Sequence, residues 1–338
     1  MLCRPQALLA LSTLLLSPCL IAQTQPPPAV QIFPLTDTIG LTAQKATVKA
    51  IEYQGRKAVL VAPARGNADG FAFLPGTDFQ DGTIEADIAL KITTPPGVRM
   101  PGFIGIAFRA RPDASHYDMF YVRPGNSHSP DQAMRNHSVQ YVEGPDFGWY
   151  KLRREFPFVY ESYADLKTES WIRMKIEVSG RDAKLYLNGS GEASLVVHGL
   201  RGEDLRGSVA LWGYQGEEAY FSNVRITNAK PAPISNGSDA TGTWQVKYAS
   251  DAGLIAGSLK LTRNGNNLTG TWSGDLGSNL AVQGTWRNGY VELTFPCTWM
   301  KETAQVTAHL EGWIDGNSAQ GRMVVEGRAD GPWTAAKQ

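Results

Sequence analysis

Alternation of apolar and polar residues with a period of two is the feature that most constrains the fold of this chain. Between residues 83 and 91, Ile84, Ile88 and Leu90 alternate with more polar neighbours, and residues 171–178 repeat the pattern. Such a period places one set of side chains on a core and the other on the opposite face of a strand. No segment shows an amphipathic helical period for more than a turn or two. The sequence therefore predicts an all-β protein.

Turn signals divide the first two thirds of the chain into short strands. The 35 glycines and 20 prolines fall largely between the alternating runs, as they do in turn-rich β structure. Asn188-Gly189 is a hairpin signal between two such runs. We expect an antiparallel sandwich of two sheets. Its further strands are expected at 48–53, 57–62, 103–109, 117–123, 138–142, 183–188, 193–197, 208–212 and 220–227.

The last hundred residues differ from the rest of the chain in their sequence pattern. Gly-Thr-Trp recurs at 242–244, 270–272 and 284–286, and six of the nine tryptophans lie in this part. Turn signals recur roughly every ten to twelve residues, which predicts about eight strands in a small up-and-down barrel, lipocalin- or avidin-like in architecture. Most of these tryptophans should fill its core, because each buries a large area. A ligand pocket inside the barrel stays open as an alternative.

Four segments follow from these patterns. Residues 1–22 read as a signal peptide, 23–228 as the sandwich, 229–241 as a linker rich in proline and small polar residues, and 242–338 as the barrel.

The expected signal peptide predicts export to the periplasm or the outside of the cell. Arg4 provides its positive charge, and the apolar run 7–16 is shorter than the roughly 20 residues that span a bilayer. We favour cleavage after Ala22 over lipidation at Cys19, because Pro18 stands where a lipoprotein signal has a small residue. Cleavage would leave Cys297 alone, which excludes an internal disulfide and a cysteine zinc cluster.

Charge gives no reason to expect a nucleic-acid partner. Lys+Arg and Asp+Glu both total 32, so no net field steers the chain toward a polyanion or an anionic membrane surface. We expect a carbohydrate partner and no membrane span. The oligomeric state is left open by the sequence.

The stretch 116–163 contains nearly every candidate functional residue. Three of the five histidines lie there, among interleaved aromatic and forked polar side chains. Sugars bind by stacking their apolar faces on rings while polar side chains hold their hydroxyls, so this composition suits a carbohydrate. The alternative is that these polar groups only satisfy the backbone of a long loop. The expected substrate-binding residues are Arg109, His116, Tyr121, Arg123, Asn126, Asp131, Arg135, Asn136, Gln140, Trp149 and Tyr160, and we expect them to line one open trough.

His137, Asp118 and Glu161 are the candidates for acid–base catalysis. A divalent metal such as calcium, held by His116, Asp118 and His137, is a further hypothesis. Neither a phosphate-binding glycine loop nor a nucleophile elbow occurs in the sequence.

The first domain resembles the concanavalin A-like lectin and glucanase superfamily, and within it the secreted 3-keto-disaccharide hydrolase-like domains. The resemblance covers about residues 30 to 228. It rests on the segments 79–85, 105–109, 123–126, 131–141, 184–189 and 220–226. It implies glycan binding or glycan cleavage, with calcium in some members.

The chain departs from one well-known catalytic motif of that superfamily. Glu85-Ala86-Asp87 matches the start of the Glu-x-Asp-x-x-Glu strand of family-16 glycoside hydrolases, whose paired carboxylates perform a retaining reaction. Leu90 occupies the position of the last glutamate, so that machinery is absent. We therefore expect Glu85 and Asp87 to be exposed strand residues.

Three functions remain open at this point. The chain is a glycoside hydrolase or lyase acting on a (3-keto-)disaccharide or oligosaccharide, a non-catalytic glycan-binding protein, or a cell-envelope interaction module.

Overall fold

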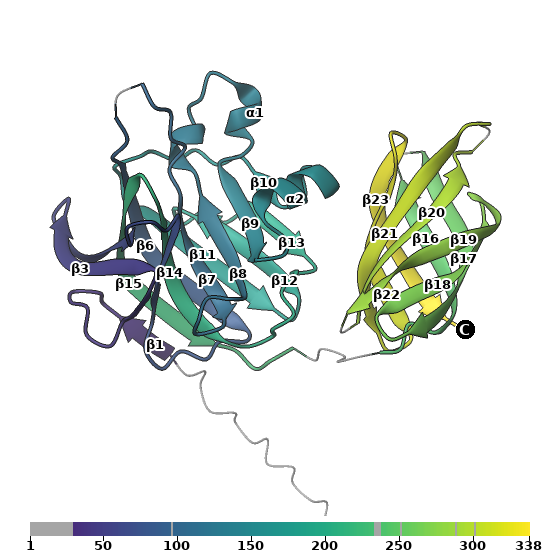
Figure 1. Ribbon diagram of the computed structural model, residues 1–338, viewed down its shortest axis with the longest axis horizontal. Coiled ribbons are helices and arrows are strands. Elements are labelled where there is room, and N and C mark those ends of the chain that lie inside the picture. Colours follow the sequence, from purple (N-terminus) through teal and green to yellow (C-terminus); the bar gives the residue numbers. More distant parts are fainter. Residues whose placement is uncertain (1–29, 96, 233–237, 251, 288, 301) are drawn as a thin grey trace, which may run out of the picture.

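The computed structural model describes residues 30–95, 97–232, 238–250, 252–287, 289–300 and 302–338. It contains a two-layered β-sandwich followed by a closed antiparallel β-barrel (Figure 1). The predicted all-β class, with a sandwich preceding a barrel, is confirmed. The expected signal peptide and both of its cysteines lie outside the described residues.

The first layer of the sandwich is an eight-stranded sheet. Ile84, Ile88 and Leu90 of the alternating run are buried in the core between the layers. The order across this sheet is β13 (Leu195–His198), β12 (Asp182–Leu187), β11 (Ile172–Ser179), β6 (Gly82–Ile92), β15 (Glu217–Asn228), β4 (Arg56–Pro63) and β3 (Ala46–Tyr53), with β1 (Val30–Phe33) paired to β15.

The second layer is a seven-stranded sheet. Tyr117 and Phe71 come from strands separated by two others, yet their ring centroids lie 5.1 Å apart. Adjacent strands lie about 4.8 Å apart, so contact between rings three strand spacings apart requires this sheet to curve. The order is β10 (Glu161–Ser162), β9 (Val139–Gly144), β8 (Tyr117–Val122), β7 (Ile104–Ala110), β14 (Ser208–Tyr214), β5 (Asp69–Phe73) and β2 (Thr42–Gln44).

Short helical segments occur in the long insertion of the sandwich. Asp131 caps α1 by accepting a hydrogen bond from the backbone N–H of Ala133, the usual role of an aspartate at this position. Among the described residues no helix is long and apolar enough to cross a membrane. The segments are the 3-10 turn η1 (Pro124–Asn126), α1 (Gln132–Arg135) and α2 (Trp149–Glu155).

The barrel is an eight-stranded meander in which sequential strands pair and the last strand closes on the first. Trp244 and Trp272 are almost fully buried in its interior, and the Trp272 ring stacks on Phe295 at 5.1 Å. Tryptophan therefore fills this core, as expected from the sequence. The strands are β16 (Gly242–Ser250), β17 (Gly253–Asn264), β18 (Asn267–Gly274), β19 (Gly277–Arg287), β20 (Tyr290–Thr298), β21 (Gln305–Asp315), β22 (Ser318–Val325) and β23 (Ala329–Lys337).

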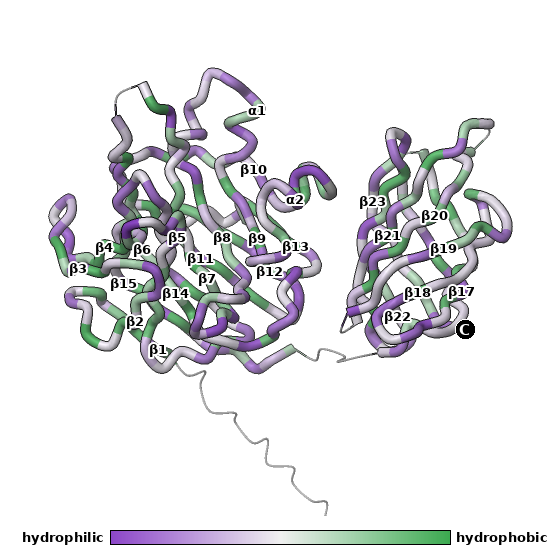
Figure 2. Tube along the Cα trace, viewed as in Figure 1, coloured by the Kyte–Doolittle hydropathy of each residue, from purple (hydrophilic) through white to green (hydrophobic). Residues whose placement is uncertain are grey.

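The two modules have separate cores, because their buried apolar residues form distinct clusters. Hydrophobic stretches follow the strands in both, whereas α2 is hydrophilic along most of its length (Figure 2). The modules contact each other through polar and aromatic side chains. One of these contacts is an ion pair between Arg201 of the sandwich and Glu311 of the barrel.

Candidate functional site

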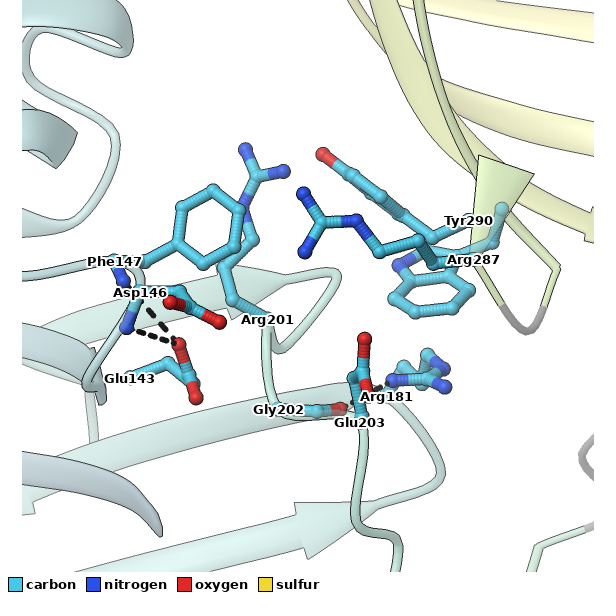
Figure 3. A pocket seen from close by; sticks show the side chains of 10 residues that line it. Glu143, Asp146, Phe147, Arg181, Arg201, Gly202, Glu203, Arg287 and Tyr290 are labelled. Atoms are coloured by element: carbon cyan, nitrogen blue, oxygen red, sulfur yellow. Dashed lines mark hydrogen bonds between the residues drawn. The ribbon is translucent and has the colours of Figure 1, made fainter. Parts of the chain in front are cut away.

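A small cleft lies where the sandwich meets the barrel. Its lining side chains come from both modules and face a common space (Figure 3). They combine rings, guanidinium groups and carboxyl groups, which are the groups that hold sugars in protein sites. The lining residues are Glu143, Asp146, Phe147, Arg181, Arg201, Gly202 and Glu203 of the sandwich, and Arg287, Tyr290 and Trp313 of the barrel.

The carboxyl groups on the sandwich side are placed by the turn that follows β9. Glu143 lies near the end of this strand, and Phe147 returns to form a β-bridge with it. One carboxyl oxygen of Glu143, Oε2, accepts hydrogen bonds from the backbone N–H groups of Asp146 and Phe147, at 3.2 Å each. This arrangement fixes Glu143, while the exposed Asp146 side chain stands next to it.

The environment of Glu143 favours its protonated form. The residue is only 3% exposed, and Asp118 stands directly opposite it in the β8–β9 register. Burial, followed by the charges of Asp118 and Asp146, raises the pKa of Glu143 to about 8, since a desolvated carboxyl beside other carboxylates resists ionisation. The raised pKa favours the protonated form of Glu143 at neutral pH, the form that can donate a proton.

Asp118 itself lies beneath the cleft, out of contact with solvent. It accepts hydrogen bonds from the hydroxyl of Tyr141 and, at 3.2 Å, from the backbone N–H of Gly202. Burial raises its pKa. Asp118 was a catalytic candidate from the sequence, but its full burial keeps it out of contact with a ligand in the cleft.

A divalent cation could be held by His116, Glu143 and Asp146. One donor atom from each lies within 4.8 Å of the other two, and His116 Nδ1 stands 3.6 Å from Glu143 Oε1. One imidazole and two carboxylates suit several divalent metals. A cation bound there would require Glu143 to be ionised, so metal binding and proton donation by Glu143 exclude each other.

The metal trio predicted from the sequence is not formed. His116 precedes β8, and His137 precedes β9. Because these strands are antiparallel, with Tyr117 opposite Gly144 and Val122 opposite Val139, the two histidines lie at opposite ends of the strand pair. The structure replaces this trio with the group of His116, Glu143 and Asp146.

Arg201 joins the two modules at the wall of the cleft. Its side chain is 1% exposed and forms an ion pair with Glu311 of the barrel. Its Nε donates a hydrogen bond to the hydroxyl of Tyr160 at 2.8 Å, and its guanidinium carbon lies 4.2 Å from the ring centroid of Phe156. Tyr160, expected to bind substrate, is thus buried behind Arg201.

Arg181 and Tyr290 enclose Trp313 at the other wall. The guanidinium carbon of Arg181 lies 3.3 Å from the Trp313 ring centroid, and the Tyr290 ring lies 4.6 Å from the same ring. The hydroxyl of Tyr290 donates to Glu311 at 2.7 Å. These packed groups form an aromatic and cationic wall of the cleft.

His137 and Glu161 form a separate pair outside the cleft lining. His137 Nδ1 lies 2.8 Å from Glu161 Oε2, at ion-pair distance but without the alignment of a hydrogen bond. Arg153 of α2 donates to both oxygens of the same carboxylate. Its guanidinium also lies over the ring of Trp149, which is 45% exposed.

We expect His137 to be neutral at pH 7. Burial lowers its pKa below the usual 6.5, and Arg153 and Arg123 add to this effect, although Glu161 opposes it. Below about pH 6.5 the unfolded ring therefore binds a proton more readily than the folded ring does. The stability that the neutral ring contributes above pH 6.5 is lost on acidification. A titration of the ring followed by NMR should give a pKa below 6.5, and one above 6.5 would contradict the prediction.

Arg123 is the centre of a buried polar network beside His137. Its guanidinium donates to the hydroxyl of Tyr121, to the backbone oxygen of His137 at 3.0 Å and to Gln140 at 3.3 Å. Asn126 donates to the same His137 oxygen. All four predicted side chains, those of Tyr121, Arg123, Asn126 and Gln140, are less than 5% exposed. They hold the irregular segment around η1 in place and are not accessible to a ligand.

Other predicted residues support the backbone. Arg135 donates to the carbonyl of Ser129, and Asn136 ends α1. Arg109 is fully buried and forms an ion pair with Asp81 at 2.9 Å. The predicted residues are therefore not gathered in one open trough: His116, Asp118 and Tyr160 approach the cleft, and the others lie elsewhere.

The outer face of β6 also differs from expectation. Asp87 is 9% exposed, because Arg56, Arg173 and Asn223 all donate to its carboxylate. The prediction that Asp87 is an exposed strand residue is wrong. Three donors from neighbouring strands surround it, and nothing in its own strand indicates them.

Sequence reasoning missed most residues of the cleft. Glu143 and Asp146 flank a Gly-Pro pair at the end of an expected strand, and two carboxyls around such a turn were an available signal. Arg201, Tyr290 and Trp313 had no comparable signal, because they meet only when the modules dock.

Comparisons with solved structures find β-sandwich lectins, carbohydrate-binding modules and glycosidases. A carbohydrate-binding module of Bacillus subtilis is 19% identical, with 56% of this chain and 96% of that chain covered and a TM-score of 0.39. The calcium-bound exoplasmic/lumenal domain of VIP36 is 9% identical, with 58% and 86% covered and a TM-score of 0.41.

A third structure, an endo-β-galactosidase of Clostridium perfringens, is 9% identical, with 93% and 98% covered and a TM-score of 0.34. No family model matches the chain, and neither does any curated protein. Likenesses this remote do not identify a substrate or an activity, and membership among the 3-keto-disaccharide hydrolases stays a prediction.

Proposed function

We propose that this chain is an exported glycoside-cleaving enzyme, a hydrolase or lyase, that holds its glycan in the cleft between sandwich and barrel. The observation that carries the proposal is the buried carboxyl of Glu143, whose pKa is raised to about 8, next to the exposed carboxylate of Asp146 at the edge of a cleft lined by aromatic residues. Both reactions that the sequence left open need a proton for the departing glycosidic oxygen.

When two neighbouring carboxyl groups lie in different environments, the buried one tends to stay protonated and can act as the acid, and the exposed one is ionised and can act as the base. In retaining glycosidases the two carboxyls lie about 5 Å apart, and burial keeps one of them protonated. Glu143 and Asp146 have donor atoms within 4.8 Å of each other, and Glu143 is the buried member. In this proposal Glu143 protonates the leaving oxygen, and Asp146 acts as the nucleophile or base.

Substrate binding follows from the walls of the cleft. Phe147, Tyr290 and Trp313 offer ring surface, and Arg181, Arg287 and Glu203 offer groups that can hold hydroxyls.

A paired screen tests the proposal. Purified protein is assayed on ordinary and oxidised (3-keto) disaccharides and oligosaccharides, beside a glycan-binding array. Cleavage that requires Glu143 supports an enzyme. Binding without turnover, unaffected by Glu143→Gln, indicates the lectin-like alternative. Absence of both binding and cleavage would reject a carbohydrate function.

We expect Tyr290→Ala to weaken glycan binding roughly two- to tenfold, the usual contribution of one stacked ring. Tyr290→Phe retains the ring and should bind almost as tightly. Tyr186→Ala removes a ring of β12 that lies outside the cleft lining, and it should have no effect. Calorimetric titration measures all three. Equal loss in Tyr290→Ala and Tyr186→Ala would contradict binding in the cleft.

The same screen, repeated with calcium or another divalent ion, decides the role of the His116 group. If Glu143 is a proton donor, added metal inhibits the reaction by ionising it. If the residues instead hold a metal for catalysis, a chelator abolishes activity and metal restores it.

A further inference from the structure

Three guanidinium groups line the cleft, and two of them, those of Arg181 and Arg287, have no carboxylate at ion-pair distance among the described residues. Arg181 and Arg201 come from the sandwich and Arg287 from the barrel. In Figure 3 all three lie around the space between the modules, with Arg201 and Arg287 extending toward it. Like charges gathered in a confined site repel one another unless an anion lies between them.

Arg201 keeps one donor for a ligand. The residue is 6% exposed, and its Nη2 pairs with Glu311. Its Nη1 is buried and forms no hydrogen bond with any described residue, with Glu292 at 3.8 Å as its nearest ion-pair partner. A buried guanidinium donor without an acceptor is costly, and a ligand oxygen would satisfy it.

Arg181 has no carboxylate at ion-pair distance among the described residues. Its Nη1 donates to the backbone oxygens of Gly202 at 2.8 Å and Leu200 at 3.4 Å, and its Nε has no acceptor. Burial lowers the pKa of Arg181 to about 9. Desolvation thus makes the charged form of Arg181 less favourable, and a bound anion would offset that free-energy cost.

Arg287 ends β19 at the opposite side of the cleft. It is partly exposed, and no ion pair joins it to a described carboxylate. The acidic groups that line the same space are the buried Glu143 and the exposed Asp146 and Glu203. None of them is paired with Arg181 or Arg287.

We propose that the glycan bound in the cleft is acidic, and that Arg181, Arg201 and Arg287 hold its anionic group, the carboxylate of a uronic acid or a sulfate ester. The inference rests on the proposed function and names its substrate class. Guanidinium groups bind such anions through charge-assisted hydrogen bonds from forked donors. Arg287 closes the site from the barrel, so the bound anion bridges the two modules.

The test compares acidic and neutral ligands on the full chain by calorimetric titration. The ligands are oligogalacturonate, a sulfated galactan oligosaccharide and a neutral galactan oligosaccharide of equal length. We expect at least one acidic ligand to bind roughly tenfold or more tightly than the neutral one at low salt, with the preference falling as salt is added. The acidic ligand that binds better identifies the anion as carboxylate or sulfate.

Arg287→Gln should remove most of that preference, so that the acidic and the neutral ligand bind with similar affinity. Arg263→Gln is the matched control, because Arg263 is also an arginine of the barrel but packs over Trp286 and does not line the cleft. Neutral binding without acidic preference, or a preference that survives Arg287→Gln, overturns the inference while the proposed function stands. Absence of binding by every ligand overturns both.

Discussion

Glu143→Gln is expected to lower kcat by about 10²–10⁴-fold, the usual contribution of a positioned proton donor. The amide cannot release a proton to the leaving oxygen. Its carbonyl oxygen can still accept the hydrogen bonds that Asp146 and Phe147 donate to Glu143 Oε2, so the turn after β9 should remain intact. Steady-state kinetics on a substrate found in the screen measures the loss.

The pH dependence follows from the raised pKa of Glu143. The group is active when protonated, so activity should fall as the pH rises through about 8. The same shift acts on stability. Between the ordinary value of 4.5 and about 8 the unfolded carboxyl releases a proton that the folded one keeps, so this group destabilises the fold increasingly over that range. Glu143→Gln removes that penalty and should be no less stable than the parent at neutral pH.

Measuring the stability of Glu143→Gln distinguishes a loss of catalytic activity from a loss of folded structure. A variant that is inactive and melts at or above the parent temperature supports proton donation by Glu143. Asp146→Asn provides the companion measurement, because it removes the neighbouring carboxylate and with it one of the charges that raise the pKa of Glu143. Full activity in Glu143→Gln would contradict the proposed mechanism.

Arg201→Ala is expected to weaken the docking of the barrel on the sandwich by about 3 kcal/mol. Removing one partner of a buried ion pair typically costs about 3–5 kcal/mol. We expect the lower end, because burial already raises the pKa of Glu311 to about 7 even though Arg201 opposes the shift. Without Arg201 this carboxyl can take up a proton and avoid remaining as a buried charge.

Small-angle scattering and calorimetry measure the effect. The parent should unfold with coupled modules, whereas Arg201→Ala should show a larger radius of gyration and two separate transitions. The double variant Arg201→Met with Glu311→Leu replaces the pair by apolar groups and should recover most of the docking. Unchanged scattering in Arg201→Ala would show that Arg201 does not hold the modules together.

The candidate site was only partly predictable. The sequence directed attention to the segment 116–163, and it contains Glu143, Asp146 and Phe147. Within that segment it could not separate side chains that face a cleft from those that serve the backbone. Asp131 and Arg135 bind the turn around α1, and Arg123 binds the carbonyl of His137, because an irregular segment must satisfy its polar groups without a ladder of strands.

The sequence alone was enough to predict the strands and the sheet architecture of this protein. The alternation at Ile84–Leu90 and the turn at Asn188-Gly189 depend on neighbours a few residues apart, and both recur in the structure as β6 and the β12–β13 hairpin. Only the tertiary structure decided which charged groups meet. Arg201 and Glu311 lie 110 residues apart in separate modules, and their contact depends on how two finished surfaces dock, which no local period encodes.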